Sequence, residues 1–165
     1  PILLSYQAKA NGAATPLVDL AASINREMPA HVARRLGEEL NNRAGKHIAG
    51  ARILLLGVCY KKNVEDTRVS ASMALIGEIE RMGAACDYHD PFFPTMPMTR
   101  DHPQLAGRTS APLTAETIRG YDAVVIGADH DGVDYALLAR EAAIIVDTRN
   151  VMSRLGLGNE RLVKA

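Results

Sequence analysis

The stretch Arg52-Ile53-Leu54-Leu55-Leu56-Gly57-Val58 decides the fold of this chain. A short, continuous apolar run that ends in turn residues is typical of a strand buried on both faces of a parallel sheet. Further strands and the helices between them are predicted at 72–82, 84–89, 121–128, 133–140 and 143–147. The alternation of strands and helices predicts an α/β fold with a Rossmann-like open parallel sheet.

A long helical pattern precedes the sheet. Apolar side chains recur at intervals of three or four residues over 17–40, which is the period of an amphipathic helix. Thr15 can cap this helix, Pro16 suits its first turn and Gly45 suits its end. Pro29 removes one backbone donor and crowds the preceding turn, so we expect the helix to kink or restart there.

The chain is therefore expected to consist of a central helical segment at 1–46, followed by an α/β domain at 47–165. The stretch 95–112 is rich in Pro, Thr and Arg and has no periodicity, so we predict a loop. The first residue is Pro1 in place of Met, in an apolar stretch without a helix cap. We expect the chain to be a piece of a longer protein.

Composition limits the partners of the chain. Hydrophobic residues make up 47% of its 165 residues and charged residues 23%, the balance of a folded protein. Its 19 basic and 19 acidic residues give zero formal net charge, so no overall field draws it to nucleic acid or an anionic membrane. No apolar run approaches the roughly 20 residues of a membrane span. Cys59 and Cys86 form no CxxC pair, which favours a reducing, cytoplasmic environment.

The loop after the first strand carries the side chains best suited to a ligand. In open parallel sheets, ligands bind beyond the carboxyl ends of the strands. The stretch 57–70 begins there and contains Tyr60, Lys61 and Arg68. Lysine and arginine neutralise phosphate and an aromatic ring packs on a base or sugar, so the loop suits a phosphorylated ligand with a ring. A solvated polar loop would have the same composition, and the chain has no GxGxxG sequence for a cofactor diphosphate.

Three other features have both a functional and a structural interpretation. Cys59 lies near lysines that favour a thiolate, but a small cysteine at a strand end is commonly a packing residue. Asp129-His130-Asp131 with Asp134 contains metal-ligand types, yet consecutive residues do not converge easily, and a capped turn before a helix is the plainer explanation. Asp90 could hold a cofactor ribose, although no glycine-rich loop accompanies it. We therefore predict no metal site and no catalytic residue.

The loop after the first strand also resembles a family motif. The run Gly57-Val-Cys-Tyr-Lys-Lys-Asn-Val-Glu-Asp-Thr-Arg-Val-Ser-Ala-Ser72 is similar to the G-x-x-(F/Y)-K-x-x-x-x-D-x-R-x-S motif of the UDP-glucose and UDP-N-acetylmannosamine 6-dehydrogenase family. Further resemblances lie at His89-Asp90-Pro91, Asp129-His130, Asp147-Thr-Arg-Asn-Val151 and Ile24-Asn-Arg-Glu-Met-Pro29. The last of these resembles the helix that joins the two halves of those enzymes. The resemblance covers nearly the whole chain, apart from 95–112.

The resemblance implies roles for the matching residues. Lys61 would bind the UDP-sugar, Tyr60 would form an aromatic wall beside the nucleotide, and Arg149 would contact the nucleotide sugar. Arg68 would face the cofactor, and Asp66 would orient its loop. The intact enzyme would oxidise a sugar C6 alcohol to a carboxylate with NAD, which a preceding N-terminal domain would bind, and an upstream cysteine would be the nucleophile. This chain would supply recognition and would be inactive alone.

The resemblance also implies a partner. The corresponding helix lies at the dimer core in the family, and the apolar stripe of the long segment is too extended for one small sheet to cover. We therefore expect a homodimer through 17–44. Because a fold alone does not give a function, a stand-alone nucleotide-binding or regulatory module is the alternative to the UDP-sugar-binding part of a dehydrogenase.

Overall fold

The structure is a computed structural model that describes residues 2–165, so Pro1 lies outside the described residues. A five-stranded sheet in the order β2-β1-β3-β4-β5 forms its centre, and all neighbouring strands are parallel. The strands are β1 (Arg52–Leu56), β2 (Ala85–His89), β3 (Ala123–Ile126), β4 (Ile145–Asp147) and β5 (Leu162–Lys164). The predicted open parallel sheet is confirmed. The sequence pattern did not predict β5, because Leu162-Val163-Lys164 lacks the continuous apolar run that indicated β1, β3 and β4.

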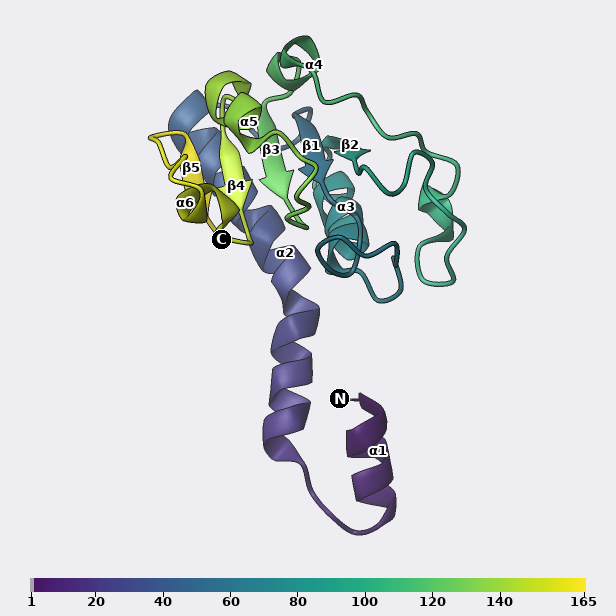
Figure 1. The fold of residues 1–165 in the computed structure, drawn as a ribbon. Helices are drawn as coiled ribbons and strands as arrows, with labels where there is room; N and C mark the ends of the chain where they lie inside the picture. Colours follow the sequence, from purple (N-terminus) through teal and green to yellow (C-terminus); the bar gives the residue numbers. More distant parts are fainter. Residues whose placement is uncertain (1) are drawn as a thin grey trace.

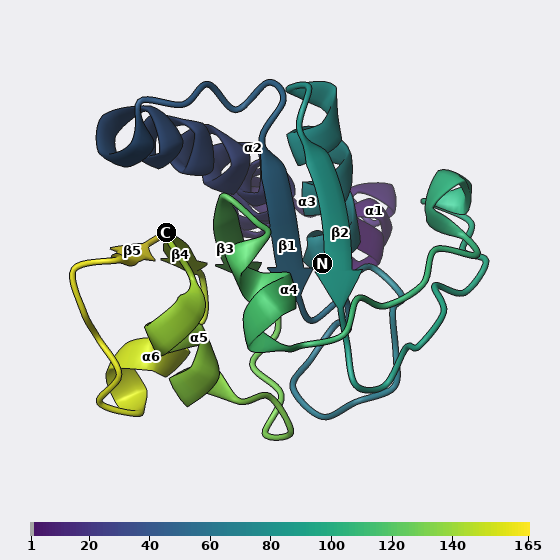
Figure 2. The same ribbon diagram turned by 90° about the horizontal axis from the view of Figure 1, so that it is seen from above.

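Helices cover both faces of the sheet (Figure 2). One face carries α2 (Pro16–Ala44) and α3 (Ala71–Arg81), and the other carries α4 (Ala115–Arg119), α5 (Tyr135–Glu141) and α6 (Val151–Arg154). Alternate side chains of β1 point to opposite faces of the sheet. Ile53 and Leu55 lie in one core, and Leu54 and Leu56 lie in the other. The apolar run in β1 is therefore continuous because both of its faces are buried.

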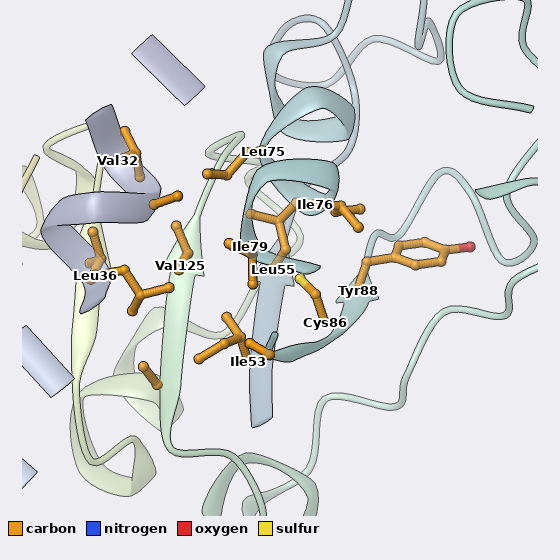
Figure 3. Packing of buried hydrophobic residues seen from close by; sticks show 14 of the residues in the cluster. Val32, Leu36, Ile53, Leu55, Leu75, Ile76, Ile79, Cys86, Tyr88 and Val125 are labelled. Atoms are coloured by element: carbon orange, nitrogen blue, oxygen red, sulfur yellow. The ribbon is translucent and has the colours of Figure 1, made fainter. Parts of the chain in front are cut away.

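The core between the sheet, α2 and α3 fixes the second half of the long helix (Figure 3). Leu36 from α2 and Ile76 and Ile79 from α3 pack with Leu55 and Val125 from the sheet, and none of these side chains is more than 1% exposed. Full burial of one such side chain stabilises the fold by about 1.5–3 kcal/mol. This packing places the N-terminal end of α3 beside the edge of the sheet where the strands end.

The long helix α2 runs without interruption through Pro29, so of the two predicted outcomes, a kink or a restart, the restart does not occur. A proline inside a helix loses one backbone hydrogen bond and costs about 3 kcal/mol. The following turns bury Val32, Leu36 and Leu40, which offsets that cost. The helix ends at Gly45, which has the left-handed conformation with φ of 60°, as predicted.

The first helix, α1 (Ile2–Ala10), and the first half of α2 project from the α/β body as a helical hairpin (Figure 1). Thr15 makes no side-chain cap; its hydroxyl donates to Ser5 Oγ at 2.9 Å and so joins the two helices. Lys9 Nζ lies 3.2 Å from Asp19 Oδ2 across the hairpin. Among residues 2–165, none of the helices combines the length and the hydropathy that crossing a membrane requires.

The stretch 95–112 is a loop that is anchored to the body at several points. It contains one short 3-10 helix, η1 (Pro103–Leu105), and buries Met96 and Leu105. The hydroxyl of Tyr88 on β2 lies 3.1 Å from the Arg108 carbonyl oxygen, and the Arg108 guanidinium binds Glu80 of α3 at 2.5 Å. The absence of a periodic pattern therefore predicted irregular backbone, but not these anchors.

Candidate functional site

The loops after β1, β2, β3 and β4 leave the same edge of the sheet, because these strands are parallel. Two glycines bring the exits of β1 and β3 together. Gly57 has φ of 81°, and a Cβ atom there would lie 2.6 Å from the Cβ of Ala128. A Cβ atom at Gly127 would overlap the hydroxyl of Ser72 at the start of α3. Both loops thus meet the N-terminal end of α3, and the chain itself fills the space beside the glycines.

Tyr60 and Lys61 lie on the loop after β1. The backbone N–H of Tyr60 donates to the Asp66 carbonyl at 2.7 Å, which closes this loop. Tyr60 is 51% exposed, and Lys61 Nζ lies 5.2 Å from the centre of its ring, within the range of a cation–π contact. Lys62 pairs with Asp131 at 2.6 Å, whereas no carboxylate within residues 2–165 lies within ion-pair distance of Lys61. Lys61 is therefore the uncompensated cation of this loop.

Arg149 lies on the loop after β4, and local hydrogen bonds fix its backbone. The buried carboxylate of Asp147 accepts bonds from the N–H groups of Arg149 and Met152, both at 2.9 Å. The hydroxyl of Thr148 donates to the Ile126 carbonyl at 2.7 Å. The Arg149 side chain remains partly exposed, so a fixed backbone presents an accessible guanidinium.

Asp129 links Arg149 to a second arginine. Its Oδ1 lies 3.5 Å from Arg149 Nε, and its Oδ2 accepts a hydrogen bond from Arg154. Burial alone would raise the pKa of Asp129, but the bond from Arg154 and the charges of both arginines hold it below its usual value. The contact with Arg154 is the closer one, so Asp129 would keep a partner if Arg149 turned to a ligand.

A cleft of about 210 Å³ lies beside Arg149, between α2, the start of α3 and the loops after β3 and β4. Its lining includes Met28, Val32, Ser72, Gly127, Thr148 and Arg149. Pockets for whole small molecules have about 300–1,000 Å³. This cleft could therefore hold one part of a ligand whose remainder lies elsewhere.

Arg68 points into solvent, with a side chain that is 86% exposed. Its guanidinium donates to both carboxylate oxygens of Asp66, with Nε at 3.0 Å from Oδ1 and Nη2 at 2.8 Å from Oδ2. These bonds lower the pKa of Asp66 to about 2. Asp66 thus holds Arg68, and the role of Arg68 toward a cofactor stays a prediction.

Three buried side chains from three loops meet at this edge: Cys59 after β1, Asp90 after β2 and His130 after β3. Asp90 Oδ2 accepts the Val58 N–H at 2.7 Å and lies 3.3 Å from both Cys59 Sγ and His130 Nε2. Asp90 is 1% exposed, and the chain's own donors surround it. The interpretation of Asp90 as a ribose ligand is therefore wrong.

This cluster suits neither a metal ion nor a nucleophile. His130 Nδ1 accepts the Asn63 N–H at 2.9 Å, so the proton of the neutral imidazole is on Nε2, the nitrogen that faces Asp90 and cannot then bind a metal. Burial, together with the charge and hydrogen bond of Asp90, raises the pKa of Cys59 to about 12, so its thiol stays protonated. Asp134 accepts the Leu137 N–H at 2.9 Å and caps α5, which confirms the capped turn.

The sequence from 54 to 154 matches the family described as the UDP-glucose/GDP-mannose dehydrogenase family, UDP binding domain. This chain belongs to that family. The matched range contains Tyr60, Lys61, Arg68 and Arg149, and it ends within α6. The family's UDP-binding domain thus corresponds to the part of the α/β body that carries the loops after β1, β2, β3 and β4.

Individual relatives support this family membership. A UDP-N-acetyl-D-mannosamine dehydrogenase of Methanococcus maripaludis is 30% identical over 142 residues, which cover 80% of this chain and 30% of the relative. UDP-glucose 6-dehydrogenase AglM of Haloferax volcanii is 28% identical over 94% of this chain and 35% of its own length. The solved UDP-N-acetyl-D-mannosamine dehydrogenase of Pyrococcus horikoshii superposes with a TM-score of 0.66 and 27% identity, over 90% of this chain and 32% of that one. The chain spans about a third of the length of these relatives.

The convergence of Cys59, Asp90 and His130 was not predicted from the sequence, in which each had been interpreted separately. A signal was present, because each residue lies in the first few positions after the end of a parallel strand and such strand ends share one edge of a sheet. The contact from His130 to Asn63 could not be predicted, because it depends on the path of an irregular loop in which Asn63 has a φ of 56°.

Proposed function

We propose that this chain binds the UDP part of a nucleotide sugar at the carboxyl edge of its sheet, within an NAD-dependent enzyme that oxidises the sugar C6 alcohol to a carboxylate. The main support is the uncompensated Lys61 beside the half-exposed ring of Tyr60. The ammonium would neutralise a phosphate oxygen, and the ring would pack on the uracil or the ribose. Both residues lie within the family's UDP-binding domain.

Arg149 would supply a second cation. Its guanidinium can donate two parallel hydrogen bonds to a diphosphate or to sugar hydroxyls, which gives orientation as well as affinity. At 3.5 Å, its contact with Asp129 is loose, and Asp129 keeps Arg154 as a closer partner. Arg149 can thus exchange Asp129 for a ligand without leaving a buried carboxylate unpaired.

In the intact enzyme, NAD would accept the hydride. The residues of this chain do not by themselves fit that cofactor, because the sequence has no GxGxxG loop and the space beside Gly57 and Gly127 is filled by the chain. We infer that NAD is bound chiefly outside this chain, with the exposed Arg68 facing it. Both cysteines are free and buried, and we infer a cytoplasmic location.

Calorimetric titration of the chain tests this function directly. The ligands are UDP-glucose, UDP-N-acetylmannosamine, UDP-N-acetylglucosamine and UDP, with GDP-mannose as the base-specificity control. We expect heat from the UDP compounds and a weaker response to GDP-mannose, and the rank of the sugars would identify the substrate. A folded chain that binds none of the UDP compounds would refute the proposal.

A further inference from the structure

The N-terminal turn of α3, a helix of 11 residues, has backbone donors without partners. The N–H of Ser70, the residue before the helix, bonds to the Thr67 carbonyl at 3.2 Å. The N–H groups of Ala71, Ser72 and Met73 have no hydrogen-bond acceptor within residues 2–165. The side chain of Ser70 does not cap them. Because Ser72 and Met73 are buried, an acceptor from outside the chain would complete this turn.

The Ser72 hydroxyl is also without a partner. Ser72 is 5% exposed and lines the cleft beside Arg149, and within the described part of the chain its side chain makes no hydrogen bond. Gly127 lines the same cleft, and a Cβ atom there would overlap the Ser72 hydroxyl. The hydroxyl of the neighbouring Ser70 is buried and has no partner either. Buried hydroxyl groups normally have a hydrogen-bond partner, so Ser72 and the free N–H groups together point to a ligand that accepts hydrogen bonds.

The charge of the cleft favours an anion. Arg149 places a guanidinium in its lining, which contains no carboxylate side chain. Ala71 and Ser72, the first two residues of α3, line it as well, so the positive end of the helix dipole lies at the cleft. A helix N-terminus with free N–H groups and a nearby cation suits a phosphate or a carboxylate.

The position of the cleft in the sheet agrees with a ligand site. The chain passes from β1 through α3 to β2 on one side, whereas β3 lies on the other side of β1. The direction of the strand order thus changes between β1 and β3, and open parallel sheets bind ligands at such a switch point. With about 210 Å³, the cleft has room for one charged group of a ligand but not for a whole nucleotide.

We propose that the N-terminal turn of α3, the Ser72 hydroxyl and the Arg149 guanidinium form a subsite for one oxyanion, a phosphate or a carboxylate group. The free N–H groups and the hydroxyl donate hydrogen bonds to its oxygens, and the guanidinium neutralises its charge. The identity of the anion rests on the proposed function. In a UDP-sugar it is the diphosphate, and in the oxidised product the C6 carboxylate is the second candidate.

Inorganic phosphate tests the subsite without a nucleotide. In a nitrogen-15 NMR titration at constant ionic strength, we expect saturable shifts of the amide signals of 71–73, with chloride as the control. Ala165 also lines the cleft, so the titration is repeated on the chain extended by Gly-Ser-Gly, which moves the terminal carboxylate away. Absence of saturable shifts at 71–73 in both forms would overturn the proposal.

Ser72→Ala separates binding from stability. Because this hydroxyl has no partner in the chain, its removal should not lower the free energy of unfolding. It should raise the Kd for phosphate about tenfold, because a hydrogen bond to a charged group is lost. Ser153→Ala removes an exposed hydroxyl of α6 and should leave the Kd unchanged. A Kd that is the same in a folded Ser72→Ala chain and in the wild type would contradict the role of Ser72.

Ala71→Pro removes one backbone donor from the turn. Proline suits the first position of a helix, and Ser70, with ψ of 120°, has the extended backbone that a residue before proline needs. The helix should therefore persist while the Kd for phosphate rises about fivefold or more. Ala115→Pro makes the same change at the start of α4 and should leave the Kd unchanged. Unchanged affinity in both Ala71→Pro and Ser72→Ala would overturn the subsite.

UDP-glucose and UDP-glucuronate then distinguish the two anions. Shifts at 71–73 with both compounds would identify the diphosphate, and shifts with UDP-glucuronate alone would identify the C6 carboxylate. Calorimetric binding of both compounds without shifts at 71–73 would overturn the subsite and leave the proposed function intact. Phosphate binding at 71–73 in a chain that binds neither compound would refute the proposed function and support the subsite.

Discussion

At the scale of single residues, Asp90 is a buried carboxylate that contacts residues of three loops, those after β1, β2 and β3. Burial would raise the pKa of Asp90, but His130 at 3.3 Å and the N–H groups of Phe92 and Val58 lower it in the folded chain to about 2, below the usual 3.8. A carboxylate with a lowered folded-state pKa stabilises the fold above about pH 4, and this contribution is lost as the pH falls toward 2. The shift corresponds to about 2 kcal/mol.

Asp90→Asn is therefore expected to lower the free energy of unfolding at pH 7 by about 2 kcal/mol and to flatten its decline between about pH 4 and pH 2. Denaturant unfolding at several pH values would measure both effects. Asp101→Asn changes an exposed aspartate and is the matched control. Equal acid sensitivity of wild type and Asp90→Asn would show that the stabilisation comes from other carboxylates.

Lys61 is expected to contribute more to UDP-sugar binding than its neighbour Lys62. A charge-assisted hydrogen bond contributes roughly 1.5–3 kcal/mol, so Lys61→Met, which keeps most of the side-chain stem, should weaken binding about tenfold or more. Lys62 already pairs with Asp131 in an exposed ion pair, worth about 1 kcal/mol or less, so Lys62→Met should change the Kd by less than about fivefold. Calorimetric titration of both variants with a UDP-sugar measures their Kd values. An equal loss of affinity in Lys61→Met and Lys62→Met would contradict the special role of Lys61.

At the scale of elements, the exit of β1 depends on Gly57. A Cβ atom at Gly57 would meet the Cβ of Ala128 at 2.6 Å in a backbone with φ of 81°. Gly57→Ala should therefore lower the free energy of unfolding by about 2 kcal/mol or more and weaken ligand binding at the same edge. Gly77→Ala is the matched control within α3, where no atom lies within 4 Å of the new Cβ. It should stabilise the chain by about 0.5–1 kcal/mol, and loss of stability in both variants would contradict this account.

The elements also show what the sequence could predict. The strand at 52–56 and the helix that ends at Gly45 followed from patterns of many residues, because burial and capping act locally and repeat. The helix did not restart at Pro29, because the burial of Val32, Leu36 and Leu40 in the following turns offsets the cost of a proline inside a helix. The contact between Asn63 and His130 joins residues 67 positions apart, and no periodicity reports such a contact. The composition of the loop 57–70 indicated Lys61 as a residue suited to a phosphorylated ligand, whereas Arg149 was predicted as a ligand from the resemblance alone; both roles stay predictions.

At the scale of the whole molecule, the projecting hairpin of α1 and α2 leaves a large apolar surface in solvent. Leu17 is 80% exposed, Leu20 57% and Ile24 51%, and Leu4 and Tyr6 of α1 are exposed as well. Extended apolar surfaces of this kind mark sites of association. We propose that a second copy of the chain covers this hairpin and that 1–46 acts as the dimerisation segment, joined to the α/β domain at 47–165 by the packing of Val32, Leu36 and Leu40 of α2 in its core.

The double variant Leu17→Lys with Leu20→Lys should shift the chain from dimer to monomer in light scattering. Charged side chains on this stripe would have to be desolvated in the interface, whereas they are solvated on a monomer. Met98→Lys changes an equally exposed apolar residue in the loop 95–112 and should leave the dimer intact. A wild-type chain that is strictly monomeric at high concentration would contradict dimerisation through this hairpin.

This chain alone should not oxidise any UDP-sugar with NAD. Hydride transfer needs a bound nicotinamide, and the sequence has no GxGxxG loop to hold one. Covalent catalysis needs a thiolate beside the sugar, yet burial and Asp90 raise the pKa of Cys59 to about 12, and burial with the charge of Glu80 raises that of Cys86. Binding without turnover is therefore the expected result. The assay follows NADH absorbance in mixtures of the chain, NAD and each UDP-sugar, with Cys59→Ala as the control. Turnover in the wild type that disappears in Cys59→Ala would show that Cys59 is a nucleophile.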